Sequence, residues 1–177
     1  MRFFNRFLIN FLGILFLQNV MGFTINNTLG VTATVGGGGG NGGAISGGGS
    51  GATVGSSTPI MKFPNYYPLN FSPSRASSTF TVTVAPNVAY YIKISQGQGV
   101  GATENQRYLT QLGGTQQLKY NLFQDSGYQH PYGSMGQVLR RIGTGLPEMI
   151  TIYGEIPSNQ RVEAGTYLDR VTISITF

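Results

Sequence analysis

The amino-acid sequence predicts an all-β sandwich on the strength of three observations. Short runs of alternating apolar and polar residues recur along the chain, and Gly, Pro and Asn turns separate them. Charged residues make up only 10% of the 177 residues, against roughly 25% in a typical soluble domain. The remainder is rich in Gly, Ser, Thr and aromatic residues, a composition that favours strands and turns over helices. The length fits one ordinary domain.

Residues 1–22 have the three parts of a secretory signal peptide. Arg2 and Arg6 supply positive charge, an apolar run follows from Phe7 to Leu17, and Val20 to Gly22 suits a signal peptidase. The apolar run has about 11 residues, whereas a membrane-spanning helix needs roughly 20. We therefore expect an exported chain that begins at Phe23 and does not insert in a membrane.

Residues 23–35 alternate along their whole length, which is the period of a strand whose side chains point to opposite faces. Asn27 is the single polar residue on the apolar side. The predicted apolar face consists of Phe23, Ile25, Leu29, Val31, Ala33 and Val35.

Residues 36–57 are rich in Gly and Ser, which predicts a flexible linker. A phosphate-binding Gly-rich loop would need a following helix and a Lys. This segment has no Lys and no helical pattern after it, so a nucleotide site is not expected.

Residues 58–177 are predicted to form the folded body. Alternating runs occur at Phe80 to Val84, Ala89 to Ser95, Leu118 to Leu122, Ile150 to Ile156 and Val171 to Phe177. One side of each run is polar, so both sheets should have a solvated outer face.

The last predicted strand ends at Phe177 with no partner strand after it, and an open apolar edge invites pairing with another chain. The alternating segment 23–35 has no partner either. Together the two segments predict donor-strand complementation, in which a strand from one subunit fills the groove of the next. The groove would be lined by Val171, Ile173, Ile175 and Phe177.

The C-terminal half carries a family resemblance. Its motifs are Arg107 to Leu109, Leu118 to Asp125, Gly143 to Gly145, Ile150 to Pro157, Gln160, Ala164 to Asp169 and Val171 to Phe177. In order and spacing they resemble the spore coat protein U (SCPU) domain family, which includes subunits of archaic chaperone–usher pili.

The resemblance implies an incomplete immunoglobulin-like β-sandwich that is completed by a donated N-terminal strand. It also implies passage through the periplasm, a periplasmic chaperone that grips Val171 to Phe177, an outer-membrane usher, and homologous subunits as partners. The product would be an adhesive fimbria at the cell surface, of the kind important in biofilms. Gly165 and Tyr167 are expected to be structural, with Tyr167 forming a tyrosine corner before the last strand.

The chain departs from the family in two respects. Members usually carry a cysteine pair, with one cysteine near Ala85, whereas this chain has no Cys. The Gly-rich segment is also long, so the N-terminal strand could fold back into its own groove.

No catalytic site, cofactor site or metal site is predicted. His130 is the only histidine, and it lies in an expected loop, so two-histidine mechanisms are excluded. No G-x-S-x-G motif is present, and the spacing of the six acidic residues suggests no glycosidase pair. Asp125 and Asp169 are expected to bond the local backbone near turns.

The basic residues do not indicate a nucleic-acid partner. They are scattered along the sequence, and the one adjacent pair, Arg140 and Arg141, is expected in a solvated loop.

The leading functional prediction is therefore a non-enzymatic structural pilus subunit assembled by donor-strand exchange. The alternative is a self-complemented, monomeric surface-binding module or a spore or outer-coat protein.

Overall fold

A computed structural model describes residues 24–35, 59–69, 71–133 and 138–177. In these ranges the chain is all β, as predicted, with nine strands and no helix. The predicted signal peptide, Phe23 and the predicted linker lie outside the described residues. The strands are β1 Thr24–Val35, β2 Ile60–Lys62, β3 Ser74–Val82, β4 Ala89–Ile94, β5 Arg107–Gln111, β6 Gln117–Phe123, β7 Leu139–Ile142, β8 Glu148–Ile156 and β9 Gly165–Thr176.

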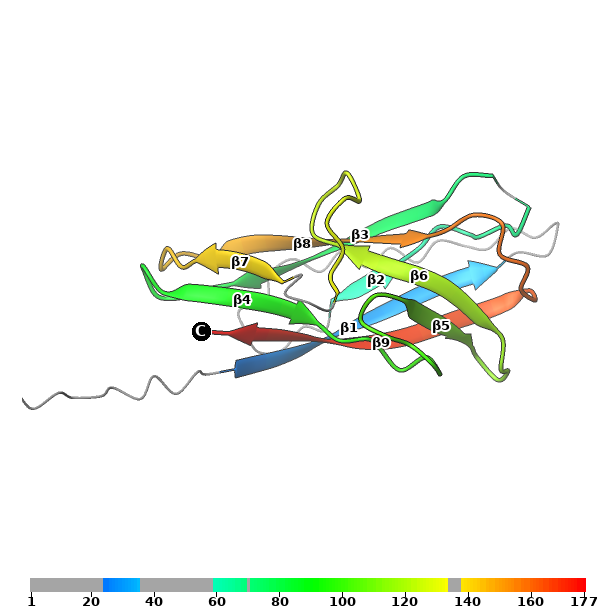
Figure 1. Ribbon diagram of the computed structural model, residues 1–177, viewed down its shortest axis with the longest axis horizontal. Helices are drawn as coiled ribbons and strands as arrows, with labels where there is room; N and C mark the ends of the chain where they lie inside the picture. The colour runs from blue at the N-terminus through cyan, green and yellow to red at the C-terminus, as the bar shows by residue number, and fades with distance from the viewer. Residues whose placement is uncertain (1–23, 36–58, 70, 134–137) are drawn as a thin grey trace, which may run out of the picture.

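The strands form an immunoglobulin-like sandwich of two layers (Figure 1). In one layer β9 is central. It pairs with β1 along one edge, and with β4 and β5 along the other. The second layer contains β8, which lies between β3 and β6. Because β6 pairs with β5 in its first half and with β8 in its second, it joins the layers into a nearly closed sheet.

The core lies between the layers and is built from the alternate residues of each strand. Ile92 and Ile94 of β4, Leu118 and Leu122 of β6, and Ile152 of β8 are all buried. This confirms the period-two patterns that predicted these strands.

Gly154 occupies an inward position of β8, between Ile152 and Ile156. A Cβ atom there would lie 2.8 Å from Cζ of Phe63. The missing side chain therefore lets Phe63 pack directly over β8.

Several strands differ from the predicted ones. β9 begins at Gly165 and β3 at Ser74, both earlier than the sequence pattern indicated. Arg140 and Arg141 do not lie in a loop, as predicted, but in the short strand β7. Both remain exposed, because β7 pairs only with β4 and turns these side chains toward solvent.

Candidate strand-binding groove

β1 fills a groove between β2 and β9, and its backbone is bonded on both sides. It runs antiparallel to β9 over its full length, from Thr24 opposite Thr176 to Val35 opposite Gly165. On its other side it runs parallel to β2, where Gly30 donates to the Pro59 carbonyl at 3.1 Å. The strand that fills the groove therefore belongs to the same chain.

The second half of β1 is deeply buried. Leu29 and Val31 are fully buried, and Ala33 and Val35 nearly so. The residues between them point away from the core and are exposed or half-buried. These four residues, which were predicted to enter the groove, thus belong to the core. They fill the space between β2 and β9.

The first half of β1 is shallower. Ile25 and Asn27 are only half-buried. Oδ1 of Asn27 accepts a hydrogen bond from the backbone N–H of Thr28 at 2.7 Å, so this inward-facing amide is satisfied by its own strand. On the outer face, Ser174 donates to Oδ1 of Asn26 at 2.8 Å. Phe23 lies outside the described residues.

One wall of the groove was missed from the sequence. Met61, Phe63 and Tyr66 are buried beside β1. The N–H groups of Phe63 and Tyr66 donate to the carbonyls of Thr32 and Thr34, at 3.0 and 2.8 Å. Two inward residues, Met61 and Phe63, between Pro59 and Pro64 were the available signal, but such a short run is a weak indication of a strand.

The other wall is β9, where the structure places the residues predicted to line the groove. Val171, Ile173 and Ile175 are buried, and Phe177 packs partly buried against the same core. Val171 lies opposite Leu29, and Ile175 lies opposite Ile25.

Asp169 fixes β9 from inside the sandwich. It is nearly buried, and its carboxylate accepts hydrogen bonds from the Tyr120 hydroxyl at 2.6 Å and the Gln98 N–H at 2.7 Å. Gly97 is at φ 87°, and any Cβ there would collide with this carboxylate. Burial raises the pKa of Tyr120, and the Asp169 charge raises it further. Asp169 lies within β9, and it also accepts a hydrogen bond from the Arg170 N–H at 2.7 Å, a local backbone bond of the kind predicted for it.

Arg107 is fully buried beside this pair and was not predicted to be in the core. Its guanidinium donates to the carbonyls of Ser95, Ile94 and Tyr132 at 2.9 to 3.0 Å, and to Oδ1 of Asn121 at 3.3 Å. Burial lowers the pKa of Arg107, while Tyr120 and Asp169 raise it. One side chain thus joins β4, β5, β6 and the segment at Tyr132 around the middle of β9.

Comparison with known proteins identifies the family of the chain. The model of the Spore Coat Protein U domain matches residues 50–174. The chain belongs to this family. The SCPU domain is also 36% identical over 72 residues to Protein U of Myxococcus xanthus. That match spans 40% of this chain and 40% of the relative.

Two solved structures are similar to the SCPU domain at low identity. The AfaE-3 adhesin from Escherichia coli matches with a TM-score of 0.46 and 14% identity, over 87% of this chain and 97% of the adhesin. The Burkholderia pseudomallei antigen and type I fimbria protein BPSL1626 matches with a TM-score of 0.43 and 14% identity, over 88% and 98% of the two chains.

At the start of β9 in the SCPU domain lie the two residues predicted to be structural. Gly165 lies opposite Val35, the last residue of β1. Tyr167 is fully buried, and its hydroxyl donates to the Glu163 carbonyl at 2.8 Å. This bond holds the turn that leads into β9.

Replacing Tyr167 with Phe should lower the free energy of unfolding by about 0.5–1.5 kcal/mol, because the Glu163 carbonyl loses its donor while the ring stays packed. Urea unfolding of the two proteins measures the difference. Tyr153→Phe is the matched control, since Tyr153 lies half-buried on the outer face of β8. An unchanged midpoint for Tyr167→Phe would mean that the bond contributes nothing to the turn.

His130 and Asp125, which the sequence analysis considered as possible site residues, lie at the surface of the SCPU domain. His130 is in a loop, where its ring contacts the Asp125 carboxylate at 3.1 Å. Asp125 also accepts the His130 N–H at 2.8 Å, a local backbone bond of the kind predicted for it. Within the described ranges, no three His, Cys, Asp or Glu side chains are grouped as metal ligands would be. Those ranges also hold no helix that is long and apolar enough to cross a membrane.

Proposed function

We propose that this SCPU domain is a structural subunit of an adhesive surface fibre, in which residues 23–35 of one copy fill the groove of another. The observation that carries the proposal is the placement of β1. Its apolar residues complete the core. The 23 residues 36–58 separate it from the body, so the same groove could be filled by the same strand from a second copy.

The packing of β1 supports a durable junction. Burying a side chain such as Leu29 or Val31 stabilises by about 1.5–3 kcal/mol. The ladder to β9 adds backbone bonds along twelve residues. A strand held in this way dissociates slowly, which is the property that a fibre requires.

The family resemblance and the predicted export signal support the partners and the location that we propose. We propose a periplasmic chaperone that contacts β9 before assembly, an outer-membrane usher, and a final place on the cell surface. The role is structural and not enzymatic.

A second candidate function is a self-complemented, monomeric surface-binding module. The observation that favours it is that β1 occupies the groove of its own chain. The two candidates differ only in which copy supplies the strand.

The test is size-exclusion chromatography and unheated gel electrophoresis of the chain from Phe23 to Phe177, purified with and without its chaperone. A fibre subunit should give a ladder of oligomers. A variant lacking residues 23–35, kept soluble by the chaperone, should give no ladder of its own but should accept the strand of an intact copy and form a dimer.

A stable monomer from the intact chain, together with a deletion variant that unfolds and captures no intact copy, would contradict the fibre. That result would assign the domain to the self-complemented module.

A further inference from the structure

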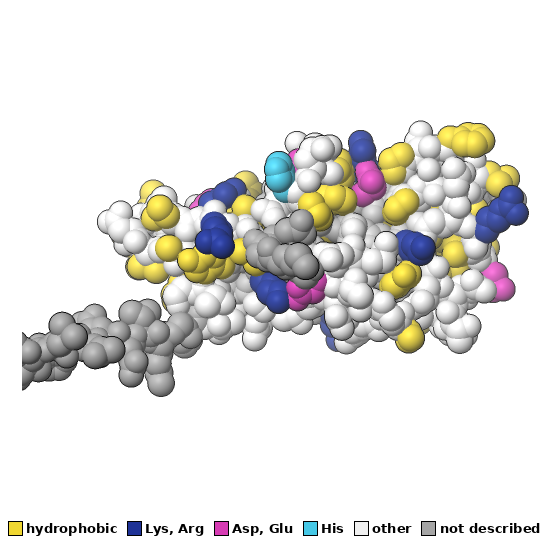
Figure 2. All heavy atoms as spheres, viewed as in Figure 1, with side chains coloured by type: hydrophobic (Ala, Val, Ile, Leu, Met, Phe, Trp, Pro, Cys, Tyr) yellow, Lys and Arg dark blue, Asp and Glu magenta, His cyan; other side chains and the backbone are white. Residues whose placement is uncertain are grey.

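Exposed apolar side chains lie over much of the visible face of the molecule, and some of them lie at each end of its long axis (Figure 2). We call one end the Val35 end, because β1 finishes there; it carries the loops from β2 to β3, β5 to β6 and β8 to β9 (Figure 1). The opposite Thr24 end carries the start of β1, the loops from β3 to β4 and β7 to β8, and the C-terminus. Both ends carry exposed apolar side chains.

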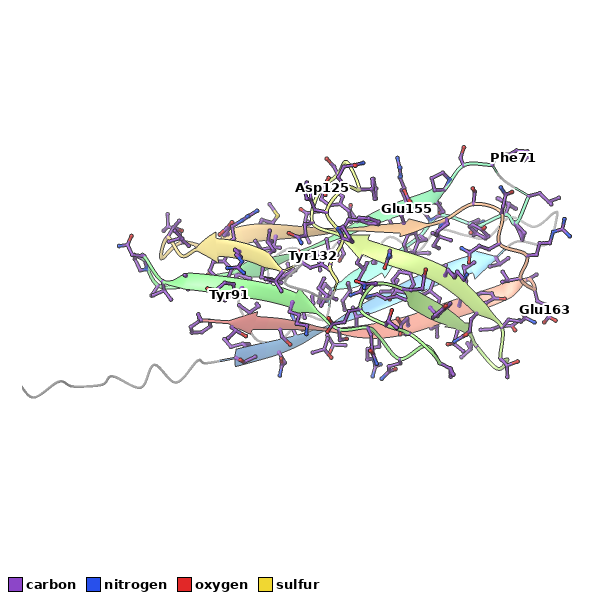
Figure 3. The ribbon with its side chains drawn as sticks, in the orientation of Figure 1. Phe71, Tyr91, Asp125, Tyr132, Glu155 and Glu163 are labelled. Carbon is purple, nitrogen blue, oxygen red and sulfur yellow. The ribbon has the colours of Figure 1, made fainter. Side chains whose placement is uncertain are left out.

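At the Val35 end, the loop from β2 to β3 presents Leu69 and Phe71, which are 78% and 88% exposed. Phe71 lies at the extremity of the molecule (Figure 3). Leu112, in the turn after β5, is exposed at the same end. Side chains of this size and exposure are unusual on a monomer surface when they gather, and they commonly mark an interface.

At the Thr24 end, the corner between β7 and β8 presents Ile142, Leu146 and Met149, the last two 69% and 72% exposed. Arg141 and Glu148 lie beside them and form an ion pair at 3.3 Å. A polar rim around an apolar centre is the usual anatomy of a protein interface.

The path of the chain brings these two ends together in a fibre. Val35 leaves the groove beside Gly165 and Tyr66, at the Val35 end. If β1 comes from a second copy, the body of that copy is tethered to this end through residues 36–58. Fully extended, that segment spans at most about 80 Å. This length allows the body of the donor to lie against the Val35 end of the acceptor, where the donated strand leaves the groove.

Every junction between neighbouring copies in such a fibre is the same. Each junction therefore joins one surface of a copy to a different surface of the next copy, and its repetition gives an open filament and not a closed ring. The Thr24 end is the surface that remains when copies align along one axis, and it carries the second apolar cluster.

We propose that successive copies of this chain dock end to end, with Leu69 and Phe71 of one copy against Ile142, Leu146 and Met149 of the next. The inference rests on the proposed function, and adds to strand exchange a second contact between folded bodies. Its occupant is a second copy of the chain.

Cysteine crosslinking tests the contact, since the chain has no Cys of its own. The double variant Phe71→Cys/Leu146→Cys places a thiol at each end, too far apart to link within one copy. Assembled material is treated with a short bis-maleimide and heated in detergent, which removes the non-covalent ladder. The matched control is Phe71→Cys/Thr172→Cys. Thr172 is exposed on β9 opposite Thr28, near the middle of both strands and away from the two ends.

We expect covalent multimers from the first variant, at about tenfold higher yield than from the control, and none from either single variant. Phe71→Cys and Leu146→Cys are surface changes, so each should form the unheated ladder of the parent chain.

An intact unheated ladder with equal crosslinking in test and control would overturn the end-to-end contact and leave strand exchange standing. Absence of the unheated ladder in the parent chain would overturn the proposed function, and the end-to-end contact with it.

Discussion

Replacing Leu29 with Asp should abolish assembly and unfold the domain when it stands alone. Leu29 is fully buried opposite Val171, so the change removes about 1.5–3 kcal/mol of apolar burial. It also buries a carboxylate without a partner, which costs several kcal/mol more. The sum is comparable to the whole stability of a small domain, about 5–15 kcal/mol.

The measurement is the unheated ladder together with urea unfolding of the isolated chain. Thr34→Asp is the matched control, because Thr34 is exposed on the same strand, and it should change stability by no more than about 0.5 kcal/mol. If the proposed periplasmic chaperone contacts β9, its binding should survive in Leu29→Asp. A ladder equal to that of the parent chain would mean that β1 is not the inserted strand.

Replacing Arg107 with Met should destabilise the domain by about 3 kcal/mol or more. Met keeps an apolar stem like that of Arg but has no donor, so the carbonyls of Ile94, Ser95 and Tyr132 lose their partners in the core. Each buried group left unsatisfied costs about 1–3 kcal/mol. Exchanging a buried ion pair for apolar residues can be neutral when both partners are replaced, but here the acceptors are backbone groups that remain.

Urea unfolding should rank the parent chain above Arg107→Lys, and Arg107→Lys above Arg107→Met, because a Lys has fewer donors and no planar fork. Arg170→Met is the control, since Arg170 is exposed on β9 and should have little effect. If Arg107→Met proved as stable as the parent chain, the guanidinium would not be what joins the strands around β9.

The strands with regular alternation were predictable from the sequence. β1 was predicted almost residue by residue, because Leu29 to Val35 alternate without interruption, and β4, β6 and β8 follow the same rule. The early part of β9 was missed, since Asp169 occupies an inward position where the pattern requires an apolar residue.

What the sequence could not indicate were the long-range polar contacts. Asp169 is tolerated inside only because Tyr120 and Gln98 reach it from elsewhere in the chain. Arg107 likewise looks like a surface residue until its carbonyl partners are brought around it. The wall at Met61 and Phe63 was missed for a simpler reason: three residues of strand are too few to show a period.

The register of β1 against β9 also determines when the domain can fold. Thr24 pairs with Thr176, 152 positions further along the chain. A chain that is made and exported from its N-terminus presents β1 first, and the partner of β1 arrives last. Folding that depends on such non-local pairing takes milliseconds to seconds. During that interval the apolar face of β1 has no cover, so the segment most prone to aggregate is produced first and protected last.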